Sequence, residues 1–308
     1  MIDKLEYLLA LAEDRHFGRA ADVVGVSQPT LSAGVKQLEE SLGVLLVQRG
    51  SRFKAFTPEG ERVLDWARRI VGDSRALKQE IAALKHGLSG HLKIAAIPTA
   101  LAIVAELTTP YRERHPNVRF TIVSETSSRI LSLLDNLEID AGLTYLDNEP
   151  LGRVTAFPLY TETYRLLTSS SGMLGDRESV TWAEVATVPL CLLTPNMQNR
   201  RIIDRLLAEA GARPIATLES NSVIVLFSHV RTGRWASVMP AKLAETLGFT
   251  DAIRAIPITD PEAVQTIGLV APAREPMMPA TAALVEEARR LAPQLDGLNV
   301  AARGSRPQ

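Results

Sequence analysis

The fold of the N-terminal region depends on a predicted helix that begins within the sequence Val26-Ser27-Gln28-Pro29-Thr30-Leu31-Ser32. Ser27 suits the N-cap position, since its hydroxyl can accept a hydrogen bond from an N–H of the first turn. Pro29 is tolerated in that turn, where its missing N–H is not needed. The buried face of the helix is predicted to consist of Leu31, Val35, Leu38 and Leu42.

Two shorter helical patterns precede this one. Residues 5–12 and residues 17–24 each repeat apolar side chains at i, i+3, i+4 and i+7. Gly25 ends the second pattern, because glycine adopts the left-handed backbone of a helix stop without steric cost. A helix, a glycine turn and a helix with a polar face form the helix-turn-helix pattern. Taken alone, the pattern fits a plain helical bundle with a solvated polar face equally well.

The polar face of the third helix suits DNA. Gln28, Ser32 and Lys36 are spaced by four residues and therefore share that face. In the major groove the amide of Gln28 can bond bidentately to an adenine edge. Thr30 and Ser32 can reach base edges or phosphate, and Lys36 can meet the DNA backbone.

Residues 44–57 predict a β-hairpin wing, in which two short strands flank a turn at Gly50. Arg49, Arg52 and Lys54 form the densest basic cluster of this region, and they would place cations on the phosphates beside the groove. The alternative is a solvated hairpin with ordinary surface charges. The position of the hairpin directly after the helix-turn-helix favours the wing.

This N-terminal region closely resembles the LysR-type transcriptional regulators. The motifs that carry the resemblance are Phe17-Gly18-Arg19-Ala20-Ala21, Val26-Ser27-Gln28-Pro29-Thr30-Leu31-Ser32, Leu46-Val47-Gln48-Arg49 and Phe56-Thr57-Pro58-Glu59-Gly60. The resemblance implies DNA contacts at Gln28, Pro29, Ser32, Lys36 and Arg49. With the chemistry above, the predicted DNA-binding set is Arg19, Ser27, Gln28, Pro29, Thr30, Ser32, Lys36, Arg49, Arg52 and Lys54.

One residue of the third helix departs from a good helix sequence. Gly34 costs about 1 kcal/mol of helix propensity against alanine. Two explanations stay open at this point: the glycine relaxes the packing of the helix, or it allows DNA to approach closely.

Residues 58–88 predict one long helix, capped by Thr57 and with Pro58 at its first position. Its apolar stripe is too long for a solvent-spanning helix without a partner, and the simplest partner is the same helix of a second copy. The alternative is packing against its own DNA-binding domain. The resemblance implies dimerisation through this helix, and tetramers in many members. The predicted dimerisation residues are Val63, Trp66, Ile70, Leu77, Ile81 and Leu84.

From residue 91 onward, apolar runs alternate with amphipathic helices, which indicates an α/β architecture with largely parallel sheets. The resemblance implies a two-lobed effector domain similar to periplasmic binding proteins, in which a small inducer binds between the lobes. We expect a DNA-binding domain at 1–57, a linker helix at 58–88, and an effector domain at 91–300. Lobe I would comprise about residues 91–160 and 266–300, lobe II about residues 161–265, and residues 301–308 a disordered tail.

Ligands of open α/β sheets bind outside the carboxyl ends of the strands, and helix starts there favour anions. Small and polar residues recur at the predicted strand ends, although helix capping explains many of them. Arg200 or Arg201 can pair with a small carboxylate or another anion; the alternative is a solvated charge on the helix face, which is the commoner case. The predicted effector-binding residues are Pro98, Thr99, Ala100, Thr126, Ser127, Ser128, Thr144, Pro195, Met197, Asn199, Arg200, Asn221 and Met239.

Composition narrows the class of protein. The chain has 308 residues, 34 Lys and Arg against 35 Asp and Glu, and a formal net charge of -1, so a nucleic-acid surface has to be a local patch. Cys191 is the single cysteine, which excludes an intramolecular disulfide and a cysteine cluster for zinc and fits a reducing compartment. The sequence shows no membrane span and no export signal, so we expect a cytoplasmic protein.

The sequence carries no phosphate loop, dinucleotide fingerprint, zinc-protease motif or nucleophile elbow, and its five histidines are scattered. We therefore predict a LysR-type, ligand-responsive transcriptional regulator that is not an enzyme and holds no cofactor or metal. Its expected partners are double-stranded DNA, a small-molecule inducer, further copies of itself, and RNA polymerase, with no membrane. The alternative from another class is a small-molecule-binding enzyme or solute carrier with a fused accessory domain.

Overall fold

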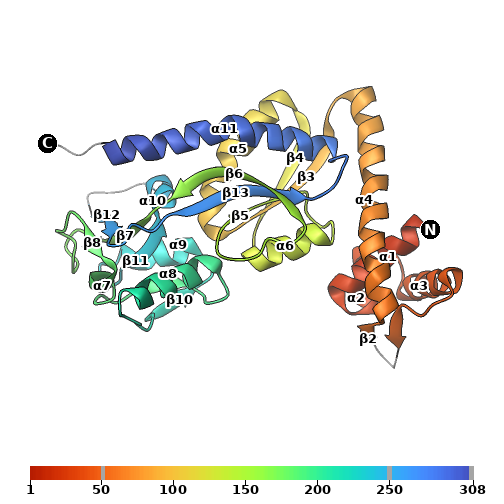
Figure 1. The fold of residues 1–308 in the computed structure, drawn as a ribbon, viewed down its shortest axis with the longest axis horizontal. Helices are drawn as coiled ribbons and strands as arrows, with labels where there is room; N and C mark the ends of the chain where they lie inside the picture. The colour runs from red at the N-terminus through yellow and green to blue at the C-terminus, as the bar shows by residue number, and fades with distance from the viewer. Residues whose placement is uncertain (50–52, 248–251, 305–308) are drawn as a thin grey trace. The chain divides into compact units, whose positions relative to one another are not determined.

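The computed structural model describes residues 1–49, 53–247 and 252–304. The chain forms two units (Figure 1). Unit 1 consists of Met1–Ser89 with the short segments Asp135–Glu138 and Arg274–Ala280. Unit 2 consists of Gly90–Leu134, Ile139–Ala273 and the chain from Thr281 onward. Unit 1 therefore contains the predicted DNA-binding domain together with the predicted linker helix.

Unit 1 begins with three helices, α1 (Ile2–Asp14), α2 (Phe17–Val23) and α3 (Gln28–Leu42). The predicted N-cap is confirmed, since the Ser27 hydroxyl accepts a hydrogen bond from the N–H of Thr30 at 3.3 Å. The helix stop at Gly25 is confirmed too, with φ of 70°. Leu31, Val35 and Leu38 are buried as predicted. The prediction for Leu42 is wrong: it is the last residue of α3 and 44% exposed, because the helix ends there.

The structure decides between the two explanations for Gly34. This glycine is buried in α3, and a methyl group at its position would lie only 2.6 Å from Cδ2 of Tyr7 in α1. That distance is shorter than any normal contact between carbon atoms. Gly34 therefore serves the close packing of α3 on α1.

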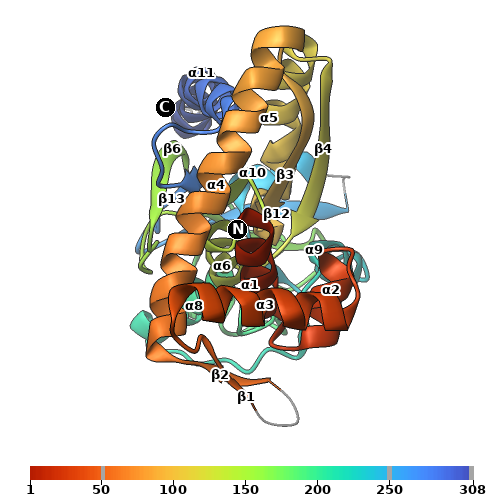
Figure 2. The ribbon, with the colours of Figure 1, turned by 90° about the vertical axis from the view of Figure 1, so that its right-hand side faces the viewer.

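The wing follows α3 as two antiparallel strands, β1 (Val47–Arg49) and β2 (Phe53–Phe56). The buried carboxylate of Glu39 accepts hydrogen bonds from the N–H groups of Leu46 and Val47, at 2.9 and 3.1 Å, and so fixes the start of β1. Helix α4 (Pro58–His86) is capped by Thr57 as predicted and stops two residues before the predicted end, at Gly87 with φ of 70°. Figure 2 shows the three helices and the wing gathered at the N-terminal end of α4.

Lobe I of unit 2 is a five-stranded sheet in the order β4-β3-β5-β13-β6. Its strands are β3 (Ser89–Ala96), β4 (Asn117–Ser124), β5 (Ala141–Tyr145), β6 (Val154–Glu162) and β13 (Gln265–Pro272). Its helices are η1 (Pro98–Ala100), α5 (Leu101–Arg114), α6 (Ser127–Asp135) and α11 (Pro279–Gly304). β3 and β5 are parallel, whereas β13 returns from lobe II and runs antiparallel to both β5 and β6.

Lobe II contains a sheet in the order β11-β7-β12-β8 and the parallel pair β10-β9. Its strands are β7 (Tyr164–Ser169), β8 (Val180–Thr181), β9 (Cys191–Leu193), β10 (Leu218–Ser220), β11 (Ser237–Pro240) and β12 (Ile253–Thr259). Its helices are α7 (Trp182–Val185), α8 (Gln198–Glu209), α9 (Val223–Val230) and α10 (Ala241–Leu247). β7 is antiparallel to both of its neighbours, so the expectation of largely parallel sheets is correct only in part.

The chain crosses twice between the lobes. It leaves lobe I after Glu162 and returns between Thr259 and Gln265. The expected disordered tail is not found at residues 301–304, where α11 continues to Gly304. The rest of that expectation, residues 305–308, lies outside the described residues.

Candidate DNA-binding face and effector site

The outer face of α3 presents the predicted DNA-reading side chains. Gln28, Pro29, Thr30 and Lys36 are exposed and Ser32 is half-buried, whereas the opposite face of the helix packs in the core of unit 1. The hydroxyls of Ser27 and Thr30 lie 2.8 Å apart and form one hydrogen bond. Lys36 has only a weak, exposed contact with Glu40, at 3.7 Å. The polar face is therefore available to a partner along its whole length.

The basic side chains around α3 have different surroundings. The guanidinium of Arg19, at the start of α2, is 65% exposed and donates to the carbonyl of Asp14 at 2.7 Å. Lys54 is exposed on β2 of the wing. The predictions for Arg52 and for the side chain of Arg49 lie outside the described residues.

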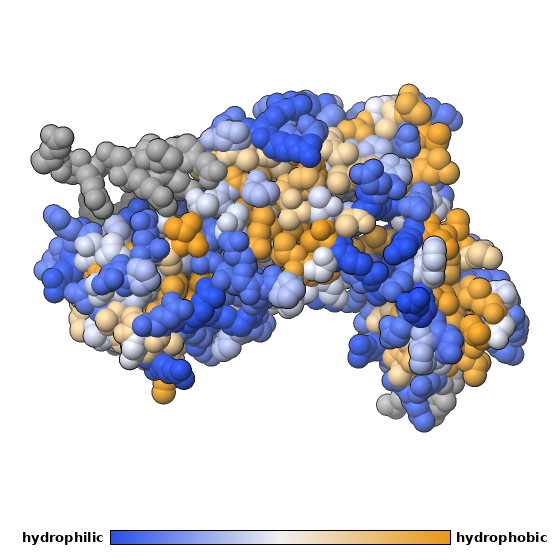
Figure 3. All heavy atoms as spheres, viewed as in Figure 1, coloured by the Kyte–Doolittle hydropathy of each residue, from blue (hydrophilic) through white to orange (hydrophobic). Residues whose placement is uncertain are grey.

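Helix α4 carries large apolar side chains that remain 40–79% exposed within the part of the chain that the structure describes. We call this set the α4 stripe: Trp66 at 60% exposure, Ile70 at 40%, Leu77 at 61%, Ile81 at 47% and Leu84 at 79%. Val63, the remaining predicted dimerisation residue, packs against the core of unit 1. Figure 3 shows hydrophobic atoms at the surface over α4. Exposed apolar side chains that form a continuous patch mark interaction sites on soluble proteins.

Three buried hydroxyls of lobe I lack normal hydrogen bonds. Thr99, Ser127 and Thr144 are 3%, 4% and 0% exposed, and none of their side-chain oxygens has a hydrogen-bond partner of normal geometry. We call them the hydroxyl cluster. A buried polar group without a partner costs about 1–3 kcal/mol. All three residues lie at or just beyond the ends of strands of the lobe I sheet.

The local fold places the three residues near the carboxyl ends of neighbouring strands. Thr99 follows β3, Thr144 lies near the end of the parallel neighbour β5, and Ser127 begins α6. A methyl group at Gly142 would lie 2.3 Å from Cγ2 of Ile130, so α6 covers the face of β5 that carries Gly142. Thr144, two residues further along the strand, shares that face.

A second polar group adjoins this edge, and sequence analysis predicted its member Asn199 but not Tyr145 or Glu162. Tyr145 donates a hydrogen bond to the buried carboxyl of Glu162 at 2.6 Å, and it accepts one from the Asn199 amide at 3.0 Å. The hydroxyls of Thr99 and Tyr164 also lie beside this group. Burial raises the pKa of Glu162 from 4.5 to about 8, although hydrogen bonds from Tyr145 and Tyr160 oppose the rise. The sequence signal that could have indicated this group is Glu162 itself, the single charged residue of β6 and the last residue of that strand.

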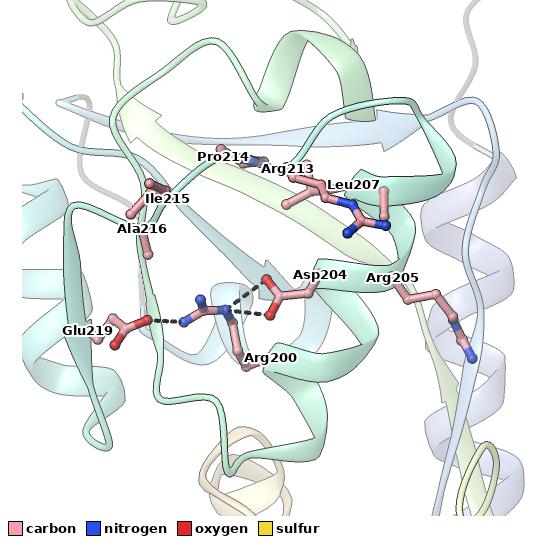
Figure 4. A pocket seen from close by; sticks show the side chains of 10 residues that line it. Arg200, Asp204, Arg205, Leu207, Arg213, Pro214, Ile215, Ala216 and Glu219 are labelled. Atoms are coloured by element: carbon pink, nitrogen blue, oxygen red, sulfur yellow. Dashed lines mark hydrogen bonds and ion pairs between the residues drawn. The ribbon is translucent and has the colours of Figure 1, made fainter.

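The two arginines that the sequence offered to an effector are bound to protein groups. Arg200 is buried, and its Nε and Nη1 donate to Asp204 at 2.8 and 3.0 Å, to Glu219 at 2.7 Å and to the carbonyl of Leu193 at 2.8 Å. Arg201 donates to Glu149 at 2.6 and 2.8 Å. Arg200 lines an open cavity of about 500 Å³ between α8 and residues 213–219, where its two carboxylate partners are visible (Figure 4).

The other predicted effector residues have mixed positions. Pro98 and Ala100 are buried in η1 beside Thr99, and Thr126 caps α6 by accepting from the N–H of Arg129 at 3.2 Å. Ser128 and Asn221 are exposed, and Pro195 lies before α8.

Met197 and Met239 pack in the hydrophobic core of lobe II, and Met239 lies within β11 rather than after a strand. These two methionines therefore belong to the core and not to the hydroxyl cluster.

The thiol of Cys191 is buried in lobe II. It is 0% exposed and donates to the carbonyls of Leu226 and Ala236. Burial raises the pKa of this thiol to about 11. Across residues 1–49, 53–247 and 252–304, no group of three His, Cys, Asp or Glu side chains is placed to hold a metal ion. No helix in the same part of the chain is long and apolar enough to cross a membrane.

Comparisons with known proteins agree with this architecture. The family model of the LysR substrate binding domain matches residues 85–293, and that of the bacterial regulatory helix-turn-helix protein, lysR family, matches residues 2–61. The DNA-binding transcriptional dual regulator OxyR of Escherichia coli K12 is 32% identical over 270 residues, which cover 87% of this chain and 88% of that protein. A probable hydrogen peroxide-inducible genes activator of Streptomyces viridosporus is 32% identical over 243 residues, with 77% and 76% covered.

Two solved structures share the whole fold. A full-length OxyR variant from Pseudomonas aeruginosa is similar with a TM-score of 0.74 and 25% identity, over 95% of this chain and 99% of that one. The regulator CbnR, solved in complex with its target DNA, has a TM-score of 0.60 and 22% identity, over 95% and 100% of the two chains. The chain therefore belongs to the LysR family of bacterial DNA-binding transcriptional regulators, which are not enzymes.

Proposed function

We propose that this regulator binds DNA as a dimer and that a small molecule bound at the hydroxyl cluster changes that binding. Gln28 and Ser32 on α3 read base edges, while Arg49, Arg52 and Lys54 on the wing hold phosphates. The exposed α4 stripe joins two copies, so that two helix-turn-helix units reach successive half-sites. RNA polymerase is the expected further partner of a regulator bound at a promoter.

The observation that carries the effector site is the set of three buried hydroxyls without normal partners, at a strand edge where open α/β sheets bind ligands. Asn199 reaches the same edge from lobe II through its hydrogen bond to Tyr145. A ligand there would touch both lobes, and it could therefore change the angle between them.

The relatives named as peroxide-inducible activators suggest peroxide as a signal. A cysteine that senses peroxide needs an accessible, readily ionised thiol. The Cys191 thiol is buried and its pKa is raised, which is the opposite environment. We therefore favour reversible ligand binding over oxidation of a thiol as the signal.

The test uses full-length protein and the DNA upstream of its own gene, with fluorescence anisotropy at two salt concentrations. Gln28→Ala should reduce the preference for this DNA over random DNA, whereas Lys54→Ala should weaken binding to both and flatten the salt dependence by roughly one unit or less. Thr99→Val and Thr144→Val should keep DNA binding but abolish the response to a crude extract of cell metabolites. An equal loss on both DNAs for Gln28→Ala, or a normal metabolite response in both valine variants, would contradict the proposal.

A further inference from the structure

We propose that the effector of this site is an uncharged, hydrogen-bonding molecule with hydroxyl, carbonyl or amide groups, rather than a carboxylate, a phosphate or an ammonium ion. This inference rests on the effector site proposed above and names the chemical class of its ligand. It replaces the expectation of an anion that the sequence suggested.

The first reason is the chemistry of the hydroxyl cluster. Each hydroxyl of Thr99, Ser127 and Thr144 offers one donor and two acceptor positions. A carboxylate is an acceptor only and an ammonium group is a donor only. A neutral ligand that both donates and accepts can use the donor and the acceptor capacity of a hydroxyl, whereas a charged group uses only one of the two.

The second reason is that the arginines of α8 are engaged elsewhere. Arg200 is held between Asp204 and Glu219, and Arg201 is held by Glu149. Arg205, one turn further along α8, donates to the amide oxygen of Asn148 at 2.8 Å. An anionic effector would have to break one of these contacts before it gained a guanidinium partner.

The third reason is that an acidic side chain, Glu162, is hydrogen-bonded to the residues at this edge. Glu162 is 2% exposed and is linked through Tyr145 to Asn199. The pKa of Glu162 is raised to about 8 because burial penalises its charged form. Lys242, whose ammonium lies 5.7 Å from the centre of the Tyr160 ring, does not prevent this rise. The burial that favours the protonated form of Glu162 also raises the free energy of a ligand carboxylate placed beside it.

The experiment compares isosteric probes that differ in charge. The melting temperature of the full-length protein at neutral pH is measured with propionamide, propionate and propylammonium, and then with benzamide and benzoate. We expect the amides to raise the melting temperature and the charged probes to leave it unchanged. The rise should be lost in Thr144→Val and kept in Thr155→Val, a control with the same change at an exposed position of β6.

The outcomes separate this inference from the proposed function. If a carboxylate or the ammonium probe stabilises the protein and Thr144→Val abolishes the effect, the effector site stands and its uncharged ligand class is overturned. If no probe of any charge stabilises the protein, or if the amide effect survives in Thr144→Val, the hydroxyl cluster is not a ligand site and the proposed effector site falls as well.

Discussion

The side-chain amide of Asn199 donates a hydrogen bond to the hydroxyl of Tyr145, with 3.0 Å between nitrogen and oxygen, and so joins α8 of lobe II to β5 of lobe I. Two neighbours in α8 extend this connection. Gln198 donates to the carbonyl of Asp147 at 2.9 Å, and Arg201 forms an ion pair with Glu149 at 2.6 Å. The first turn of α8 is thus attached to the segment that follows β5, beside the hydroxyl cluster.

The Arg201–Glu149 ion pair should control the opening of the lobes. Arg201→Gln removes it, and the segment at residues 146–150 should then exchange its amide hydrogens faster. The free energy of unfolding should fall by less than about 1 kcal/mol, because the two side chains are 41% and 35% exposed. Hydrogen exchange followed by mass spectrometry measures the effect. Arg289→Gln is the control, since Arg289 pairs with Glu286 within one helix; unchanged exchange at 146–150 in Arg201→Gln would contradict the prediction.

Glu162 should make stability depend on pH. Its pKa is raised from 4.5 to about 8, so the folded protein keeps a proton that the unfolded chain has already lost. Within that window the free energy of unfolding should fall with rising pH, by up to about 1.4 kcal/mol per pH unit. Glu162→Gln cannot ionise, and its urea denaturation should lack this slope between about pH 5 and pH 8. Parallel pH profiles for the wild type and the variant would show that the carboxyl is ionised in the folded state.

The contact between Gly34 and Tyr7 should outweigh helix propensity. Alanine at position 34 would gain about 1 kcal/mol of propensity, but its methyl group would lie 2.6 Å from the Tyr7 ring. We expect Gly34→Ala to lower the melting temperature and Tyr7→Ala to restore part of the loss in the double variant. Ala33→Gly, at an exposed position of the same helix, gives the ordinary cost of a glycine. A melting temperature raised by Gly34→Ala alone would mean that the ring moves aside freely.

The sequence predicted the elements whose signals are local. Ser27 and Thr57 act as helix caps and Gly25 as a helix stop, and the sequence signal for each lies within one turn of the chain. The burial of Leu31, Val35 and Leu38 followed from helical spacing alone. The predicted burial of Leu42 was wrong because helical spacing does not show where the helix ends and its packing partner stops.

The parts that sequence reasoning missed depend on distant residues. Asn199 was predicted at the effector site, but its hydrogen bond to Tyr145 across the lobes follows from no spacing rule. The bond from Tyr145 to Glu162 within lobe I was not predicted either. For Arg200 the sequence left open an anionic ligand or a solvated surface charge, whereas the side chain is buried and bound by Asp204 and Glu219. Met239 was expected after a strand, but β11 extends through Pro240 and the side chain belongs to the core.

The α4 stripe should hold two copies of the chain together. Ile81 is 47% exposed between Leu77 and Leu84, so Ile81→Glu would place a charge in the middle of the apolar contact. We expect the dissociation constant of the dimer to rise at least about tenfold, which corresponds to about 1.4 kcal/mol. Sedimentation velocity over a range of protein concentrations measures this change. Ala82→Glu introduces the same charge at the adjacent exposed position, outside the stripe, and should leave the dimer intact. An unchanged oligomer in Ile81→Glu would place the subunit interface on another surface of the molecule.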